Sequence, residues 1–311
     1  MTNLRFYKVA GHVFSLSVER SGLNVSNFFD LLGNYAPFLL EGYSSEFIEE
    51  NIFSLKVSEG ESFIDFQEET RQVEEGQEII CGKTAEGSPV FVFVEFDSVI
   101  SQLVCSPDFR EGRLLLSSDV SLFTPETARK VHYGVNNALM VMYALATANL
   151  DTALFHGAVV RNGGRGYMFL GKSGTGKSTH ARLWMRYVAE TDLLNDDNPV
   201  VRMYEDGARV YGSPWSGKTP CYKNEDVPLS GIVLLSQAPY NKIERLRGVH
   251  AFAALVPSIS GMRWDKKVAD GLFRTENALA QRTPLWYLEC LPDEGAARLC
   301  FDNIAIAGGN S

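Results

Sequence analysis

The sequence predicts an α/β protein in two parts: a β-rich domain over residues 1–120 and a mixed α/β domain over residues 121–311. In the first part, short and partly alternating apolar segments such as "SFIDFQ" and "VFVFVEFD" are separated by Gly, Ser, Asn and Glu. From residue 124 onward, apolar residues recur at helical spacing, and helical patterns alternate with strands. A chain of 311 residues also exceeds one ordinary core, which favours two domains.

Composition narrows the class of protein. Hydrophobic residues make up 45% of the chain and charged residues 22%, as in soluble globular proteins. The net charge of -9 argues against a general affinity for nucleic acid or anionic membranes. The five scattered cysteines show no CxxC spacing, so we expect reduced thiols. No basic start followed by an apolar run precedes the first strand, and no apolar stretch reaches the roughly 20 residues of a membrane span. We therefore expect a cytoplasmic protein with no nucleic-acid or membrane partner.

Local patterns predict the main elements in order. "FIEENIFSLKV" reads as a strand and the acidic "QEETRQVEEGQE" as a solvated turn rather than a metal site. A helix should begin the second domain, with Thr124 as N-cap and Pro125 at its first position. "ALFHGAVVRN" and "GYMFLG" read as a hairpin joined by "NGGRG". Further along, "IERLRGVHAFAALVPSI" reads as a helix.

One glycine-rich stretch matches the phosphate-binding loop pattern G-x-x-x-x-G-K-[ST] between an apolar strand and an amphipathic helix. Its glycines let backbone amides point at phosphate oxygens, Lys177 would reach the β- and γ-phosphates, and the Ser178 hydroxyl would bind Mg²⁺. A plain strand–turn–helix is the alternative. We expect nucleotide contacts from Gly171, Lys172, Ser173, Gly174, Thr175, Gly176, Lys177, Ser178 and Thr179.

An aspartate pair follows the next apolar strand. Asp196 and Asp197, in "LLNDDNPV", come 19 and 20 residues after Lys177, so a single helix separates the loop from this strand. One carboxylate would hold Mg²⁺ while the other accepts a proton from an attacking hydroxyl. The alternative is a helix cap and solvated turn before Pro199.

His156, in "FHGAVV", lies 15 residues before Gly171. Alone it would read as a core histidine. The order His156-Gly157, a short hairpin, "GKSGTGKS" and "NDD", however, resembles the catalytic core of the HPr kinase/phosphorylase family. The loop is also similar to that of the ATP-type phosphoenolpyruvate carboxykinases. The resemblance is strongest over residues 150–200.

This resemblance implies an HPr-kinase-like nucleotide domain in which His156 flanks the acceptor site and Lys177 binds ATP. It suggests Asp196 as the base and Asp197, with Ser178, as the metal ligand, an order that spacing alone leaves open. It also implies a homo-oligomer. Two features depart from the family: Thr179 replaces a glutamate after the loop serine, and a signature resembling "EIRGLGI" is missing. HPr itself and the reverse phosphorolysis are therefore not carried over.

Two basic residues are weaker candidates for substrate or phosphate contacts. In "GSPWSGKT", Gly212, Pro214 and Gly217 shape a turn from which Trp215, Ser216 and Lys218 would meet a substrate. A mobile surface loop is the alternative. Arg263, in "SGMRWD", offers a fork of donors that suits phosphoryl oxygens. An ordinary surface arginine is the alternative there.

Together these observations predict an ATP- and Mg²⁺-dependent kinase that transfers the γ-phosphoryl group to a hydroxyl of an unidentified small molecule, peptide or protein. The alternative is a nucleotide-sensing regulatory module without productive transfer. A carboxykinase-like reaction would need a second metal site and further basic residues, which the sequence does not reveal.

Overall fold

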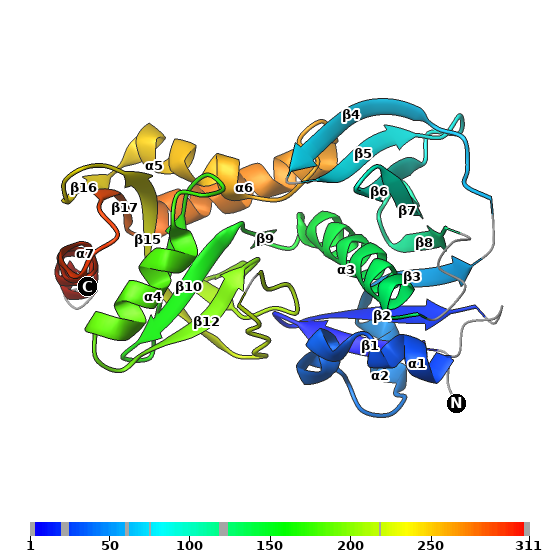
Figure 1. The fold of residues 1–311 in the computed structure, drawn as a ribbon, viewed down its shortest axis with the longest axis horizontal. Helices are drawn as coiled ribbons and strands as arrows, with labels where there is room; N and C mark the ends of the chain where they lie inside the picture. The colour runs from blue at the N-terminus through cyan, green and yellow to red at the C-terminus, as the bar shows by residue number, and fades with distance from the viewer. Residues whose placement is uncertain are drawn as a thin grey trace. The chain divides into compact units, whose positions relative to one another are not determined.

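The computed structural model describes residues 4–19, 25–59, 62–74, 76–117, 124–217 and 219–307. The chain is a mixed α/β protein with two large β-sheets (Figure 1). It divides into two compact units, residues 1–146 and 147–311. This division falls later than the expected boundary at residues 120/121, because the long helix α3, Pro125–Thr147, packs on the first sheet.

The first unit contains an eight-stranded sheet in the order β1-β2-β3-β8-β7-β6-β5-β4. Strand β3 is parallel to β2 and β8, and the other neighbours are antiparallel. The apolar run Pro89–Glu95 forms β6 and is buried throughout, as a run of Val and Phe favours. The strands are β1 (Leu4–Val9), β2 (His12–Val18), β3 (Asn51–Glu59), β4 (Gln67–Glu74), β5 (Gln77–Lys83), β6 (Pro89–Glu95), β7 (Ser98–Cys105) and β8 (Glu111–Leu116). Short helices between β2 and β3 are α1 (Val25–Asp30), η1 (Gly33–Phe38) and α2 (Ser45–Glu49).

Helix α3 packs along this sheet, and strands lie on both sides of it in Figure 1. The Tyr143 hydroxyl donates to the Val9 carbonyl of β1 at 3.0 Å, and Tyr133 donates to the Val94 carbonyl of β6 at 3.2 Å. The predicted cap is confirmed, because the Thr124 hydroxyl accepts from the amide of Thr127 at 3.2 Å.

One prediction for the first unit was wrong, and another was wrong in its first part. The acidic stretch expected as a turn forms the edge strand β4 and the start of β5, where cross-strand pairing accommodates charged side chains on an exposed edge. The stretch expected as one strand, residues 47–57, begins inside helix α2, where the Ser44 hydroxyl accepts from the Glu46 amide, and it is a strand, β3, only from Asn51 onward.

The second unit is built on a nine-stranded sheet whose long strand β15 joins two parts. On one side the order is β12-β10-β11-β15-β17-β16, and the other part continues from β15 through β14 and β13 to β9. Strands β11, β15 and β17 are parallel to one another, while β10 is antiparallel to both β11 and β12. The strands are β9 (Thr152–Leu154), β10 (Gly157–Asn162), β11 (Arg165–Leu170), β12 (Thr191–Asp197), β13 (Val200–Tyr204), β14 (Gly207–Tyr211), β15 (Asp226–Gln237), β16 (Lys242–Leu246) and β17 (Leu285–Cys290).

Helices α4 and α7 share a core with this sheet. Trp184 of α4 is fully buried beside Phe169 of β11 and belongs to the same apolar cluster as Ile304 of α7. The predicted hairpin β10–β11 is confirmed, with positive φ angles at Gly163 and Gly164. The helices are α4 (Lys177–Tyr187), α5 (Gly248–Leu255), η3 (Val256–Ser258), α6 (Lys266–Arg282) and α7 (Glu294–Ala307).

The predicted helix over residues 243–259 is wrong in its first part. Ile243 to Leu246 belong to β16, which pairs antiparallel with β17, and the helix α5 begins only at Gly248. Within the described parts of the chain, no helix is both long and apolar enough to cross a lipid bilayer.

Candidate functional site

Three chain segments meet at one end of the strands of the second sheet, which we call the sheet edge of the site. Gly157, the first residue of β10, lies opposite Leu170 of β11 on one side and opposite Asp197 of β12 on the other. Neighbouring strands are about 4.8 Å apart, so roughly 10 Å separates the ends of β11 and β12. The structure thus brings His156, the glycine-rich loop 171–178 and the aspartate pair to the same sheet edge.

The glycine-rich loop depends on its glycines. Gly171, Gly174 and Gly176 have φ angles of 152°, 78° and 101°, a region that side chains rarely adopt. A Cβ atom on Gly171 would lie 2.5 Å from the Thr175 hydroxyl, closer than atoms can approach. The loop can therefore curl back on itself only with glycine at this position.

The Lys177 side chain is hydrogen-bonded to the backbone at the start of the loop. Its Nζ atom donates to the carbonyl oxygens of Gly171 at 3.0 Å and Lys172 at 3.3 Å, and the residue is 8% exposed. The Thr175 hydroxyl donates to the same Lys172 carbonyl at 2.7 Å. These bonds hold the curled backbone with the ammonium group at its centre.

The loop ends at the start of helix α4, where the backbone amides of the first turn have no partner within the helix. Among the described residues, the amides of Gly174, Gly176 and Ser178 have no acceptor. The helix N-terminus adds a partial positive charge at the same place. The arrangement is suited to an anion such as a phosphate group. Lys172 and Ser173 are exposed at the loop tip, and Ser178 and Thr179 are half-buried in the first turn of α4.

Asp196 is a buried carboxylate on the α4 face of the sheet. It lies opposite Ala158, which lies opposite Phe169, and directly opposed residues project from the same face. Ala158 and Phe169 share a buried cluster with Ala181 of α4. Asp196 is only 5% exposed, and no described residue donates a hydrogen bond to its carboxylate. This carboxylate is therefore available to a cation or a donor from a ligand.

Asp197 lies at the end of β12 and contacts His156. Its Oδ1 atom is 3.3 Å from Nδ1 of His156, and its Oδ2 atom accepts from the side-chain amide of Asn198 at 2.8 Å. Both side chains of the His156–Asp197 pair stay partly accessible, at 41% and 35%. The φ angle of Asp197 is 146°, a conformation that costs about 1–3 kcal/mol and that concentrates at functional sites.

An irregular segment, described over residues 212–217 and 219–225, covers the outer edge of β12. The Gly217 amide donates to the Asp196 carbonyl at 2.6 Å, and Ser216 forms a β-bridge with Asp197. The segment therefore forms the wall of the site next to both aspartates.

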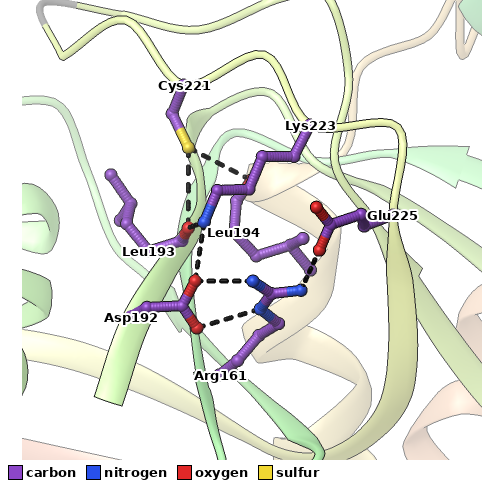
Figure 2. A network of polar contacts seen from close by, with 7 residues as sticks. All are labelled: Arg161, Asp192, Leu193, Leu194, Cys221, Lys223 and Glu225. Carbon is purple, nitrogen blue, oxygen red and sulfur yellow. Dashed lines mark hydrogen bonds and ion pairs between the residues drawn. The ribbon is translucent and has the colours of Figure 1, made fainter. Parts of the chain in front are cut away.

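A polar network anchors the far end of this segment (Figure 2). Lys223 donates to the Asp192 carboxylate and to the Leu193 carbonyl, both at 2.6 Å. Arg161 of β10 binds the same carboxylate with two hydrogen bonds and also pairs with Glu225. These hydrogen bonds lower the pKa of Asp192, those from Arg161 more than those from Lys223.

Trp215 is part of the core rather than a substrate contact. It is 2% exposed, and its backbone amide donates a hydrogen bond to the Ser213 hydroxyl at 3.2 Å. Asn195 of β12 donates to the Ser213 hydroxyl at 3.1 Å, and its own Oδ1 atom is buried without a donor in the described chain. This cluster anchors the start of the segment under the site.

The two basic candidates have different outcomes. Lys218 lies outside the described residues. Arg263 pairs with the carboxylate of Glu276, which is 1% exposed, and donates to the Val256 carbonyl at 3.0 Å. Its guanidinium thus holds a buried carboxylate of α6, and neither partner belongs to the glycine-rich loop.

The sequence interpretation missed a pocket of about 700 Å³ beside the loop. Besides the loop and α4, its walls come from the carboxyl ends of β15 and β17, at Gln237 and at Cys290 to Pro292. The sequence did not reveal that β11, β15 and β17 are parallel neighbours, and the carboxyl ends of parallel strands lie at the same end of a sheet.

In the part of the chain that the structure describes, no three His, Cys, Asp or Glu side chains form a group able to hold a metal ion. Mg²⁺ commonly uses one or two carboxylates together with phosphate oxygens and water, which fits Asp196 beside an anion-binding loop.

A scan of protein-family models and a search of curated proteins both give no match to this chain.

Proposed function

We propose that the protein is an ATP- and Mg²⁺-dependent phosphotransferase that acts on a hydroxyl group. The observation that supports this most is the shared sheet edge: an anion-binding loop, a carboxylate to which no described residue donates and an accessible histidine–aspartate pair lie within a few strand spacings. Each part has a distinct role in phosphoryl transfer, where catalysis is largely positioning and charge stabilisation.

The loop would bind the phosphates. The amides of Gly174, Gly176 and Ser178 have no acceptor in the described parts of the chain and would donate to phosphate oxygens. Lys177, now bonded to two loop carbonyls, is placed to move its ammonium group onto a phosphate. Its charge would offset the negative charge that develops on the transferred group.

Asp196 and Ser178 would hold Mg²⁺. Asp196 projects from the sheet face that α4 covers, and Ser178 lies in the first turn of α4. When bound, the ion would supply positive charge that offsets the negative charge of the phosphates. This reverses the roles suggested from the sequence, in which Asp196 was the base and Asp197 the metal ligand. Burial of Asp196 and the histidine contact of Asp197 support the reversed order.

Asp197 would act as the base, with His156 as its partner. The acceptor oxygen forms a bond to the γ-phosphorus while the bond from that phosphorus to the bridging oxygen breaks, leaving its electron pair on ADP. The acceptor proton passes to the Asp197 carboxylate. His156 and Asn198 would hold that carboxylate in place, since each contacts one of its oxygens.

The resemblance of "FHG", "GKSGTGKS" and "NDD" to HPr kinases agrees with this proposal and extends it to an HPr-kinase-related domain. Thr179 in place of the family glutamate supports a second candidate, a nucleotide sensor that binds ATP without transfer.

The test is a single-turnover assay with γ-labelled ATP, Mg²⁺ and pools of hydroxyl acceptors, comprising sugars and other polyols, and Ser-, Thr- and Tyr-containing peptides. The wild-type protein is expected to move label to one pool. Asp197→Asn should bind ATP normally and lose transfer by about 10²–10⁴-fold. Asp206→Asn, on the exposed β13–β14 turn, is the matched control and should keep full transfer. Tight ATP binding with label that never leaves ATP would instead support the sensor.

A further inference from the structure

The pocket of about 700 Å³ begins at the loop and extends away from the aspartate pair. In the strand order, β10 and β12 lie on one side of β11, and β15 and β17 lie on the other. The pocket uses Leu183 of α4, Gln237 at the end of β15, and Cys290, Leu291 and Pro292 at the end of β17. Its apolar side chains suit a flat ring system, and its volume is typical of small-ligand sites.

His180, on the pocket wall, is a buried histidine with a defined tautomer. It is 3% exposed, and its Nε2 atom is 3.2 Å from the indole nitrogen of Trp184. An indole nitrogen only donates, so Nε2 accepts. The proton must then be on Nδ1, which has no acceptor among the described residues.

Gln237 provides the complementary group. Its Nε2 atom donates to the Gly174 carbonyl at 3.2 Å. A carbonyl only accepts, so this bond fixes the orientation of the side-chain amide. Oε1 of Gln237 is left as an acceptor on the wall of the same pocket, with no donor from the described residues.

We propose that this pocket binds the adenine base of the nucleotide, with His180 Nδ1 donating to N7 and Gln237 Oε1 accepting from the 6-amino group. The inference rests on the proposed function for the position of the phosphates. Adenine presents the N7 acceptor beside the 6-amino donor, whereas guanine presents two acceptors at the same edge. Guanine would bring O6 against the Gln237 oxygen, so the pocket selects adenine.

The sheet order supports this placement independently. A nucleotide with its base at β15 and β17 and its phosphates at the loop after β11 directs the γ-phosphate toward β10 and β12. His156 and Asp197 lie at those strand ends. Base, phosphates and acceptor site therefore follow one another along the sheet edge.

The first experiment measures binding to the wild-type protein by calorimetry with Mg²⁺ and four ligands: ATP, GTP, 7-deaza-ATP and inorganic tripolyphosphate. ATP is expected to bind about 10-fold more tightly than GTP and about 3- to 10-fold more tightly than 7-deaza-ATP, which lacks the N7 acceptor. Tripolyphosphate should be the weakest.

Gln237→Leu should reduce the preference for ATP over GTP, and His180→Leu should reduce the preference for ATP over 7-deaza-ATP. Gln281→Leu and His250→Leu, at exposed positions, are controls that should change neither.

The second experiment uses Cys290, which is half-buried on the pocket wall while the other four cysteines are buried. Burial raises its pKa to about 11, so alkylation is followed at about pH 9 to obtain enough thiolate. Adenosine and ATP should protect Cys290 from alkylation, and tripolyphosphate should not.

The outcomes separate the two proposals. Equal affinity for ATP, GTP and tripolyphosphate, with no protection of Cys290 by adenosine, overturns the adenine pocket and leaves phosphoryl transfer standing. Adenine-selective binding with protection, but without transfer, supports the pocket and overturns the kinase. Failure of all four ligands to bind overturns both.

Discussion

The Nδ1 atom of His156 lies 3.3 Å from Oδ1 of Asp197, across the boundary between strands β10 and β12. The register of the sheet creates this contact, because Gly157 is paired directly with Asp197. Asn198 holds the other carboxylate oxygen, and Asp197 keeps an unusual backbone angle of 146°. This carboxylate is thus fixed on both sides while remaining partly accessible, as a positioned base requires.

The first prediction separates the roles of the two aspartates by Mg²⁺ titration of transfer activity. Asp196→Asn should raise the Mg²⁺ concentration needed for half-maximal rate by about 10-fold or more, because it removes a buried ligand charge. Asp197→Asn should lower the maximal rate and leave the Mg²⁺ requirement unchanged. The exposed Asp206→Asn variant should alter neither. The opposite pattern would return the roles to the order inferred from the sequence.

The second prediction concerns Lys177, whose ammonium group bonds two loop carbonyls. Lys177→Ala should weaken ATP binding by at least about 10-fold, since a charged hydrogen bond to phosphate contributes about 1.5–3 kcal/mol. The measurement is the increase in melting temperature that saturating MgATP gives, which depends on affinity. Lys266→Ala removes an exposed lysine of α6 and serves as the charge control. An unchanged ligand-induced shift in Lys177→Ala would exclude a phosphate role for this lysine.

Local sequence predicted those elements whose causes are local. Thr124 caps α3, the glycines at 163 and 164 turn the β10–β11 hairpin, and the glycine-rich loop leads into α4. In each case the deciding interaction joins residues within a few positions of one another. The sequence also indicated His156 and the aspartate pair as site residues.

The remainder depends on strand order, which one sequence does not reveal. The contact between His156 and Asp197 follows from β10 lying between β11 and β12. The polar stretch that became β4 is stabilised by pairing with β5, and Ile243 to Leu246 became a strand by pairing with β17. Tertiary pairing overrode local propensity in both segments. The pocket at Gln237 and Cys290 was missed for the same reason.

The third prediction follows from the buried, neutral His180. Its pKa is about 4 when folded and 6.5 ordinarily, so the unfolded chain binds more protons between these values. Stability is therefore complete above pH 6.5 and is lost as the pH falls toward 4. Between pH 7.5 and pH 5 this single group should remove roughly 2 kcal/mol. All four tryptophans lie in residues 147–311, so their fluorescence reports denaturant unfolding of this unit.

The comparison variant for this pH dependence is His180→Gln, which cannot take up the proton and should lose roughly 2 kcal/mol less between the two pH values. His250→Gln, at an exposed position on α5, should keep the wild-type dependence. If wild type and His180→Gln lost equal stability, burial of His180 would not be the source of this pH dependence.

The fourth prediction tests whether the network around Asp192 holds the wall of the site (Figure 2). Asp192→Asn leaves Arg161 and Lys223 without their shared carboxylate and should lower the free energy of unfolding by about 1 kcal/mol, because the pairs are partly exposed. Limited proteolysis should cut faster within residues 212–225. Transfer activity should fall as well, since Gly217 of this segment binds Asp196.

Glu294→Gln, which removes an exposed i,i+4 pair with Arg298 on α7, should cost less than about 0.5 kcal/mol and change neither proteolysis nor transfer. Equal behaviour of the two variants would mean that the segment is held by its other contacts, such as those of Ser213 and Gly217, rather than by Asp192.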